Sequence, residues 1–160
     1  MADLGDELGI ERFYRSFSAG ATLYYAGAPA DEVYLVREGR VRLVKKARGV
    51  ERTTGVFGPG ELLGEEALLP GAHRSATAEA IEPLTALVIE SDTFRALTRK
   101  RPEVGEGAMQ QLIRRVRRAE EQLENSLLPD PTLRVINTLL LAAEDSEVAA
   151  LPLLSLIHIS

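Results

Sequence analysis

Short apolar stretches, each closed by glycine or proline, fill residues 13–90 of this chain. In two of them, 32–38 and 40–46, apolar and polar residues alternate, and Gly39 separates the pair. This pattern predicts two strands joined as a β-hairpin. Further strands are expected over residues 21–25, 50–57, 74–81 and 84–89. Strands at this spacing are typical of an antiparallel sandwich or roll, so we expect a mainly β fold with added α-helices.

Two helices are expected after these strands. Ser91 is typical of an N-cap residue and opens a short helix that ends near Arg99. Pro102 opens a long helix over residues 103–126, because proline loses no hydrogen bond in the first turn. Small and apolar residues step along this helix by four and three alternately, between charged flanks, which favours a heptad seam against a partner helix. The predicted dimer interface consists of Met109, Leu112, Val116, Ala119 and Leu123.

The chain changes character again after the long helix. Pro129 and Pro131 interrupt that helix, and another is expected over residues 132–143. Its predicted buried side consists of Leu133, Val135, Ile136, Leu139 and Leu140. Residues 155–160 read as a translated cloning scar, so we leave them out of the expected fold.

Charge and cysteine content narrow the functional classes. Asp and Glu number 24 against 19 Lys and Arg, and the net charge of −5 argues against a large basic surface for nucleic acid. The absence of cysteine excludes disulfides, thiolate zinc sites and cysteine nucleophiles. No residue set pairs a nucleophile with a base, so no enzymatic activity is predicted. Without a signal peptide or an apolar run long enough to span a bilayer, we expect a cytoplasmic protein that binds no membrane.

The chemistry of the chain is concentrated between Gly64 and Ser75. Gly64 permits positive φ or close approach of the backbone to a ligand, and Glu65 and Glu66 open a short helical turn after it. An arginine, Arg74, returns on the next strand, and an arginine opposite a helix N-terminus is suited to a monoanionic phosphate. On residue types alone, a surface ion pair between this arginine and one of the two glutamates is the commoner arrangement. Both interpretations are therefore kept.

The segment resembles the phosphate-binding cassette of cyclic nucleotide-binding domains, in which Phe-Gly-Glu-x-Ala-Leu is followed by Arg-Ser/Ala-Ala-Thr. Residues 63–68 read Leu-Gly-Glu-Glu-Ala-Leu, and residues 74–77 read Arg-Ser-Ala-Thr. Residues 34–43 resemble the central hairpin of that family, and 57–61 its turn into the cassette. The long helix stands where Crp/Fnr regulators dimerise, and the resemblance covers residues 13–143. It implies an antiparallel β-roll of the jelly-roll (double-stranded β-helix) type plus a long C-terminal dimerisation helix.

The resemblance also implies roles for individual residues. Glu65 would hold the ribose 2′-hydroxyl, Arg74 would pair with the cyclic phosphate, and Ser75 would donate to the same phosphate. The full set of predicted ligand-binding residues is Gly64, Glu65, Glu66, Ala67, Arg74 and Ser75. The implied ligand is cyclic AMP or another cyclic nucleotide, and no cofactor or metal is required.

The chain departs from the family pattern in three ways. Leu63 replaces the usual phenylalanine, which is a mild change. Glu66 replaces an apolar residue and brings a second carboxylate near the phosphate, where it weakens anion binding if it faces inward. Ala119 and Glu120 stand where the cyclic-AMP-responsive activators have a Thr-Ser pair that contacts adenine. The resemblance therefore leaves the base of the nucleotide open.

The implied function is that of a sensor in a transcription regulator, with ligand binding coupled through the dimer helix to DNA binding in the full-length parent. The expected parts are residues 1–101 (β-roll with short helices), 102–127 (dimer helix), 128–154 (start of a truncated winged-helix DNA-binding domain) and 155–160 (tail).

Several other interpretations remain open. The chain can be a dimeric interaction module without ligand, or a haem-based gas or redox sensor in which His73 needs a second iron ligand. A cupin-like metal enzyme needs two or three histidines, and the roll supplies one. The arginines at 114, 115, 117 and 118 are interpreted as solvated flanks of the seam rather than a DNA-binding surface.

Overall fold

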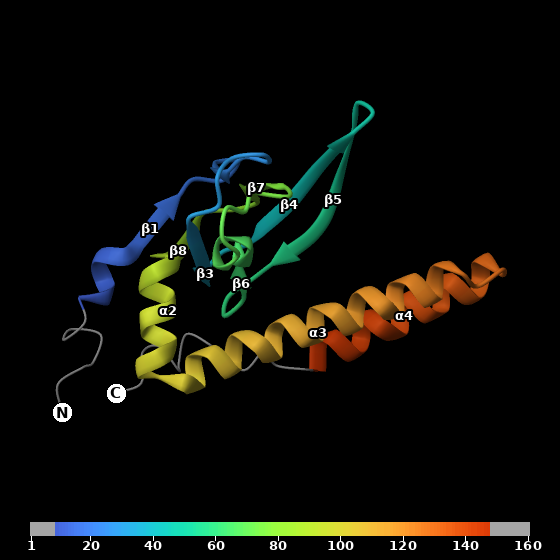
Figure 1. Cartoon of the computed structure of the whole chain (residues 1–160). Coiled ribbons are helices and arrows are strands. Elements are labelled where there is room, and N and C mark those ends of the chain that lie inside the picture. The colour runs from blue at the N-terminus through green and yellow to red at the C-terminus, as the bar shows by residue number, and fades with distance from the viewer. Residues whose placement is uncertain (1–8, 148–160) are drawn as a thin grey trace.

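Two antiparallel sheets of four strands each form the body of the molecule in the computed structural model, which describes residues 9–147 (Figure 1). The first sheet, in spatial order, consists of β1 (Tyr14–Phe17), β8 (Leu84–Glu90), β3 (Glu32–Glu38) and β6 (Leu62–Leu63). The second consists of β2 (Thr22–Tyr24), β7 (Thr77–Ala80), β4 (Val41–Ala47) and β5 (Val50–Phe57). The helical elements are η1 (Ile10–Phe13), η2 (Glu65–Leu68), α2 (Ser91–Lys100), α3 (Pro102–Ser126) and α4 (Pro131–Glu147). The predicted antiparallel roll with C-terminal helices is confirmed.

The first sheet is a middle layer with apolar residues on both of its faces. On one face, Leu35 of β3 packs in a cluster with Phe94 of α2 and Val104 of α3. On the other face, Val36 packs in a second cluster with Phe57 of β5. Because successive side chains of a strand point to opposite faces, β3 contributes to both clusters and is buried from its second to its fifth residue. The cores between the sheets and under the helices therefore meet at this strand.

The predicted hairpin between residues 32–38 and 40–46 is wrong, because β3 and β4 lie in different sheets. Gly39 is the point at which the chain changes sheet, with φ of 82°, and a Cβ there would lie 2.3 Å from the carbonyl oxygen of Pro83. The true hairpin joins β4 to β5 through Arg48 and Gly49, both with positive φ. Two residues with positive φ suit the right-handed twist of the flanking strands. The alternation of apolar and polar residues indicated which face of each strand is apolar. It did not indicate which strands pair, because other strands can show the same alternation.

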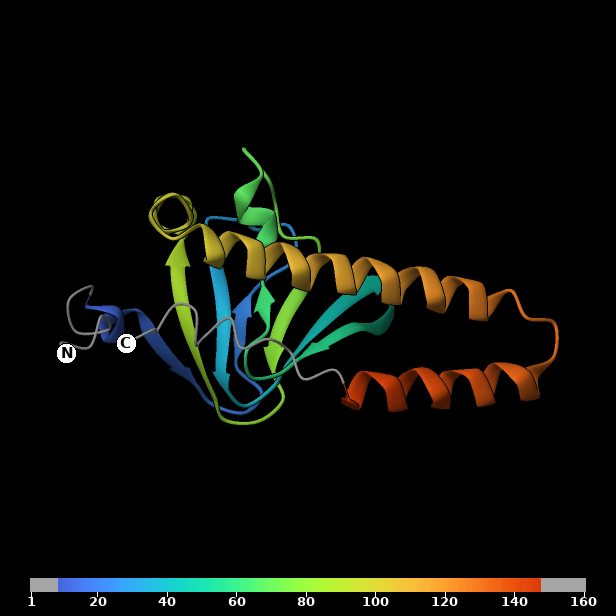
Figure 2. The same ribbon diagram turned by 90° about the horizontal axis from the view of Figure 1, so that it is seen from below.

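Helices α2 and α3 are placed on the sheets by a few inward-facing residues. Ser91 is the first residue of α2 rather than its N-cap, which is Glu90 and makes no side-chain capping bond. The first turns of α3 bury Val104 and Ala108, which join the core cluster of the first sheet. Figure 2 shows α3 continuing well past the strands. Only the first half of this helix is therefore held by the core.

Helix α4 turns back along α3, and the two form an antiparallel helical hairpin (Figures 1 and 2). Asn125 Nδ2 of α3 donates to Thr138 Oγ1 at 2.8 Å. The prediction that one side of this helix is buried is wrong for the single chain. Its predicted buried residues are 48–65% exposed, namely Leu133, Val135, Ile136, Leu139 and Leu140. They find no sheet or third helix to pack against in the described part of the chain.

The predictions for residues 148–160, including the tail, lie outside the described residues. None of the helices within residues 9–147 combines the length and the apolar content that a membrane span requires.

Candidate functional site

The turn η2 and the residues before β7 form one polar cluster, in which Gly64 is the point of closest approach. Gly64 has φ of 77°, and a Cβ on it would lie 2.8 Å from Arg74 Nη1 and 3.1 Å from the carbonyl oxygen of Glu32. Its own carbonyl oxygen accepts a hydrogen bond from Arg74 Nη1 at 3.0 Å. A glycine is required here because any side chain would displace the arginine. The positive φ predicted for this residue is confirmed, and the group that lies closest to it is a side chain of the chain itself.

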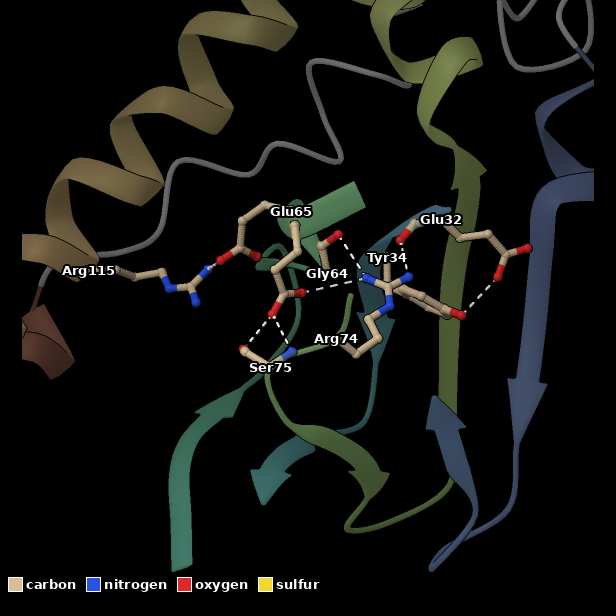
Figure 3. A network of polar contacts seen from close by, with 8 residues as sticks. Glu32, Tyr34, Gly64, Glu65, Arg74, Ser75 and Arg115 are labelled. Carbon is tan, nitrogen blue, oxygen red and sulfur yellow. Dashed lines mark hydrogen bonds and ion pairs between the residues drawn. The ribbon is translucent and has the colours of Figure 1, made fainter. Parts of the chain in front are cut away.

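Arg74 is buried and held by backbone oxygens, as Figure 3 shows. Besides the bond to Gly64, its Nη2 donates to the Glu32 carbonyl oxygen at 2.6 Å. The guanidinium lies 4.2 Å from the centre of the Tyr24 ring, within the range of a cation–π contact. Burial raises the pKa of Tyr24, and the charge of Glu66 raises it further. The ring therefore stays neutral under a fixed positive charge.

Glu66 faces this arginine and the serine that follows it. Its Oε1 accepts hydrogen bonds from Ser75 Oγ at 2.5 Å and from Ser75 N at 3.1 Å. Its Oε2 lies 3.6 Å from Arg74 Nη1. The inward orientation that the sequence analysis described as unfavourable to anion binding is therefore the one adopted. The predicted helix N-terminus contributes less, since η2 is a single four-residue 3₁₀ turn.

Glu65 points away from Arg74 and pairs with the long helix. Its Oε1 lies 3.0 Å from Arg115 Nη1, and Figure 3 shows this pair on the far side of the cluster from Glu32. The Arg115 guanidinium also lies 4.7 Å from the centre of the Phe57 ring. Sequence analysis had placed Arg115 among solvated flanks, and this is corrected. Arg115 lies four residues after the buried Gln111 and therefore on the same helix face, but the sequence alone does not show that Gln111 is buried.

A cavity of about 560 Å³ lies between this cluster, the β4–β5 hairpin and α3. The predicted residues Glu65 and Ser75 line it, and Ala119 does so from the helix. Further lining residues that sequence reasoning missed are Lys45, Thr54, Arg115, Arg118 and Gln122. Arg74 lines a neighbouring cavity of about 460 Å³ instead.

Two predicted positions lie elsewhere. Ala67 is 3% exposed and belongs to the hydrophobic core, so it supports the cassette and does not line the cavity. Glu120 is exposed on the outer side of α3. In the described part of the chain, no three His, Asp or Glu side chains converge to hold a metal ion, so the cupin interpretation gains no support there.

The predicted dimer residues form an exposed apolar stripe on α3. Met109 and Val116 are each 57% exposed and Leu123 is 64% exposed. Leu112 is half-buried, and it lines the cavity together with Val116 and Ala119, so three residues of the stripe reach the candidate site. The helix thus presents its first turns to the core, and the predicted dimer stripe overlaps the cavity at Leu112, Val116 and Ala119, whereas Met109 and Leu123 do not line it.

A β-roll with a glycine-led 3₁₀ turn, a buried arginine on the returning segment and a cavity closed by a long helix defines the class of cyclic nucleotide-binding folds. Comparison with known proteins agrees with this. The profile of the cyclic nucleotide-binding domain matches residues 14–101, and the chain belongs to that family.

Among its relatives are bacterial transcription regulators. The cyclic AMP receptor protein of Thermus thermophilus is 35% identical over 136 residues, which are 84% of this chain and 63% of that protein. The CRP-like cAMP-activated global transcriptional regulator of Mycobacterium tuberculosis is 30% identical over 80% of this chain and 58% of its own length. The crystal structure of the Thermus thermophilus catabolite activator protein superposes with a TM-score of 0.65 at 36% identity, covering 78% of this chain and 59% of the other. The chain thus spans about three fifths of the proteins that it resembles.

Proposed function

We propose that this chain is the sensor part of a cytoplasmic transcription regulator of the Crp/Fnr type, which binds a cyclic nucleotide and acts on DNA binding in the full-length parent. The observation that carries the proposal is the cavity of about 560 Å³ lined by both the cassette and α3. A ligand in that cavity would contact both the cassette, which binds it, and α3, through which binding would affect the rest of the regulator.

The size and chemistry of the cavity suit a cyclic nucleotide. Its volume lies within the range of about 300–1,000 Å³ usual for small-molecule sites. Glu65 supplies a carboxylate for a ribose hydroxyl, while Lys45 and Arg115 supply positive charge. Arg74, which lines the neighbouring cavity of about 460 Å³, has a buried Nε that lacks a hydrogen-bond partner within residues 9–147 and is a charged donor left for an anion. A cyclic phosphate is a monoanion that matches such donors.

Coupling to α3 follows from the residues that the ligand would engage. A ribose hydroxyl on Glu65 competes with Arg115 for that carboxylate. The base would then extend toward Ala119 and Gln122. Ligand binding shifts the position of α3 only to the extent that it favours one arrangement over another. With two α3 helices paired through their apolar stripe, this shift would alter the spacing of two DNA-binding domains in the parent.

The names of the relatives support this function. The proteins from Thermus thermophilus and Mycobacterium tuberculosis are described as a cyclic AMP receptor and as a cAMP-activated regulator. Cyclic AMP is therefore the first ligand to test. Cyclic GMP is the second ligand to test, because the cavity along α3 is lined by Ala119 and Gln122 and lacks the Thr-Ser pair that contacts adenine in the cyclic-AMP-responsive activators.

Calorimetric titration of the whole chain with each nucleotide tests the proposal. Arg74→Ala is compared with Arg42→Ala, whose arginine pairs with Glu79 on the outer surface of the second sheet. Removing a buried charged partner of the phosphate costs about 2–5 kcal/mol, which is roughly thirtyfold or more in affinity. The Arg42 variant is expected to bind like the original chain. Ser75→Ala, which removes only a hydroxyl, is a second variant in case Arg74→Ala does not fold.

The absence of heat with both nucleotides, from protein that is folded by circular dichroism, contradicts nucleotide binding and favours the interaction module. A visible absorption spectrum of the same sample tests for haem.

A further inference from the structure

We propose that Glu66 is a built-in competitor of the cyclic phosphate, a carboxylate that occupies the anion position of the cassette until a phosphate displaces it. The proposal rests on the proposed function and concerns the same site. It assigns to Glu66 the role of a specificity-determining residue, which sets how strongly the site favours a charged nucleotide over an uncharged nucleoside.

The first argument is that Glu66 uses the donors a phosphate would need. One of its oxygens accepts from both Ser75 Oγ and Ser75 N, at 2.5 and 3.1 Å. The other lies 3.6 Å from Arg74 Nη1. A carboxylate and a phosphodiester both present two anionic oxygens to such a set of donors. As long as Glu66 stays in place, these donors are engaged and a second anion beside it is repelled.

The second argument is that the neighbouring carboxylates are held by other partners. Glu32 accepts hydrogen bonds from Arg15 and from the Tyr34 hydroxyl, at 2.8 and 2.9 Å. Glu65 is paired with Arg115. Of these three acidic side chains, Glu66 is the one that is bonded to Ser75 and paired with Arg74. We therefore assign the anion position to the Glu66 side chain alone among these three.

The third argument is that Glu66 can leave without disturbing the core. Its side chain is 25% exposed, whereas that of Arg74 is 2% exposed. The hydrogen bonds from the arginine to the carbonyl oxygens of Gly64 and Glu32 do not involve Glu66. A rotation of Glu66 toward solvent therefore uncovers a site whose cationic partner is already positioned. The cost of that rotation lowers the affinity for every ligand that carries a phosphate there.

An uncharged nucleoside has no reason to displace Glu66, and this difference provides the test. The original chain, Glu66→Gln and the matched control Glu79→Gln are titrated with cyclic AMP and cyclic GMP, and with adenosine and guanosine. Gln keeps the length of the side chain and an acceptor for Ser75 but removes the charge. Glu79 is a half-buried carboxylate that pairs with Arg42.

We expect Glu66→Gln to bind its cyclic nucleotide roughly tenfold more tightly, because a like charge next to the phosphate is removed. Affinity for the nucleoside should stay within about twofold, and Glu79→Gln should leave both unchanged.

The outcomes separate this inference from the function on which it rests. If the original chain binds through Arg74 but Glu66→Gln binds no more tightly, the competitor role is wrong and the sensor function stands. The role is also wrong if Glu66→Gln strengthens nucleoside and nucleotide binding equally, because the change would then be a general opening of the cavity. If neither the original chain nor the variant binds any cyclic nucleotide, both proposals are overturned.

Discussion

Arg115 Nη1 of the long helix lies 3.0 Å from Glu65 Oε1 of the cassette, so one ion pair joins the helix to the turn that would hold a ribose. Both side chains are about one third exposed or less, at 30% and 26%. A pair with this exposure is expected to stabilise the ligand-free chain by only about 0.2–1 kcal/mol, as measured for solvent-accessible pairs. Its importance lies in its position rather than in its contribution to stability.

Replacement of Glu65 should reveal the ribose contact. We expect Glu65→Gln to weaken cyclic AMP binding by about 1.5–3 kcal/mol, the range for a hydrogen bond to a charged group. The 2′-deoxy form of the nucleotide should lose a similar amount with the original chain, and calorimetry measures both. The variant should bind the deoxy nucleotide with a loss of binding free energy no larger than that caused by either change alone. A full additional loss in the combination would show that Glu65 acts elsewhere.

The stability of the helix–sheet junction should depend on Gln111. This buried side chain accepts a hydrogen bond from Leu62 N at 2.9 Å and donates to the Gly60 carbonyl oxygen at 2.7 Å. Gln111→Ala leaves both backbone groups without a partner, which we expect to lower the free energy of unfolding by about 1–3 kcal/mol. Gln110→Ala, at the exposed neighbour, should stay within about 0.5 kcal/mol in urea unfolding. Equal effects at the two positions would contradict this role.

The change of sheet at Gly39 should tolerate no side chain. A Cβ at Gly39 meets the Pro83 carbonyl oxygen, whereas one at Gly20, which also has positive φ, meets nothing within 4 Å. Gly20→Ala therefore reports the conformational cost alone, about 1–2 kcal/mol. Gly39→Ala adds a steric clash, and we expect about 1–3 kcal/mol more, as for overpacked positions. Urea unfolding of the two variants measures the difference, and its absence would mean that the Pro83 turn can move away.

The apolar stripe of α3 should hold a dimer together. We expect Val116→Glu to be monomeric at concentrations where the original chain sediments as a dimer, because the change buries a charge at the centre of the seam. Gln110→Glu adds the same charge at an exposed position of the same helix and should remain dimeric. Sedimentation velocity separates the two states. An original chain that is monomeric at all concentrations would rule out the predicted interface.

Stability should fall in alkaline solution because of two buried tyrosines. Burial raises the pKa of Tyr24 and Tyr34 above the ordinary value, and the hydrogen bond from Tyr34 to Glu32 raises its pKa further. Above about pH 10 the unfolded chain loses phenol protons that the folded chain keeps, so the free energy of unfolding decreases as pH rises. Urea midpoints at about pH 9 and about pH 11 measure this loss. Tyr34→Phe should reduce the slope, and an unchanged slope would contradict the assignment.

The sequence predicted the parts of the fold that depend on local pattern. Residues 50–57 and the helix that starts at Pro102 were placed correctly because turn residues and a change of apolar period mark their ends. The pairing of strands was predicted incorrectly, since β3 and β4 lie in different sheets. β3 has four consecutive buried residues, so its neighbours are chosen by packing on both faces rather than by alternation.

The candidate site shows the same division. Gly64, Glu65, Glu66, Arg74 and Ser75 could be named from one short segment, because a turn and the strand after it are adjacent in space as well as in sequence. The contributions of Arg115 and Gln122 could not be predicted from the sequence. Helix α3 has apolar residues on more than one face, and its sequence alone does not indicate which face lines the cavity.

The sequence by itself therefore determined the class of fold, the cassette and the presence of a long helix with an apolar seam. The tertiary structure alone decided that Glu66 bonds to Ser75, that Glu65 pairs with Arg115 and that Gln111 ties α3 to the first sheet. The physical reason is the separation along the sequence of the residues that interact. Turns and periodicity act between residues a few positions apart, whereas the orientation of α3 over the sheets follows from the simultaneous packing of Val104 and Ala108 against strands from distant parts of the chain.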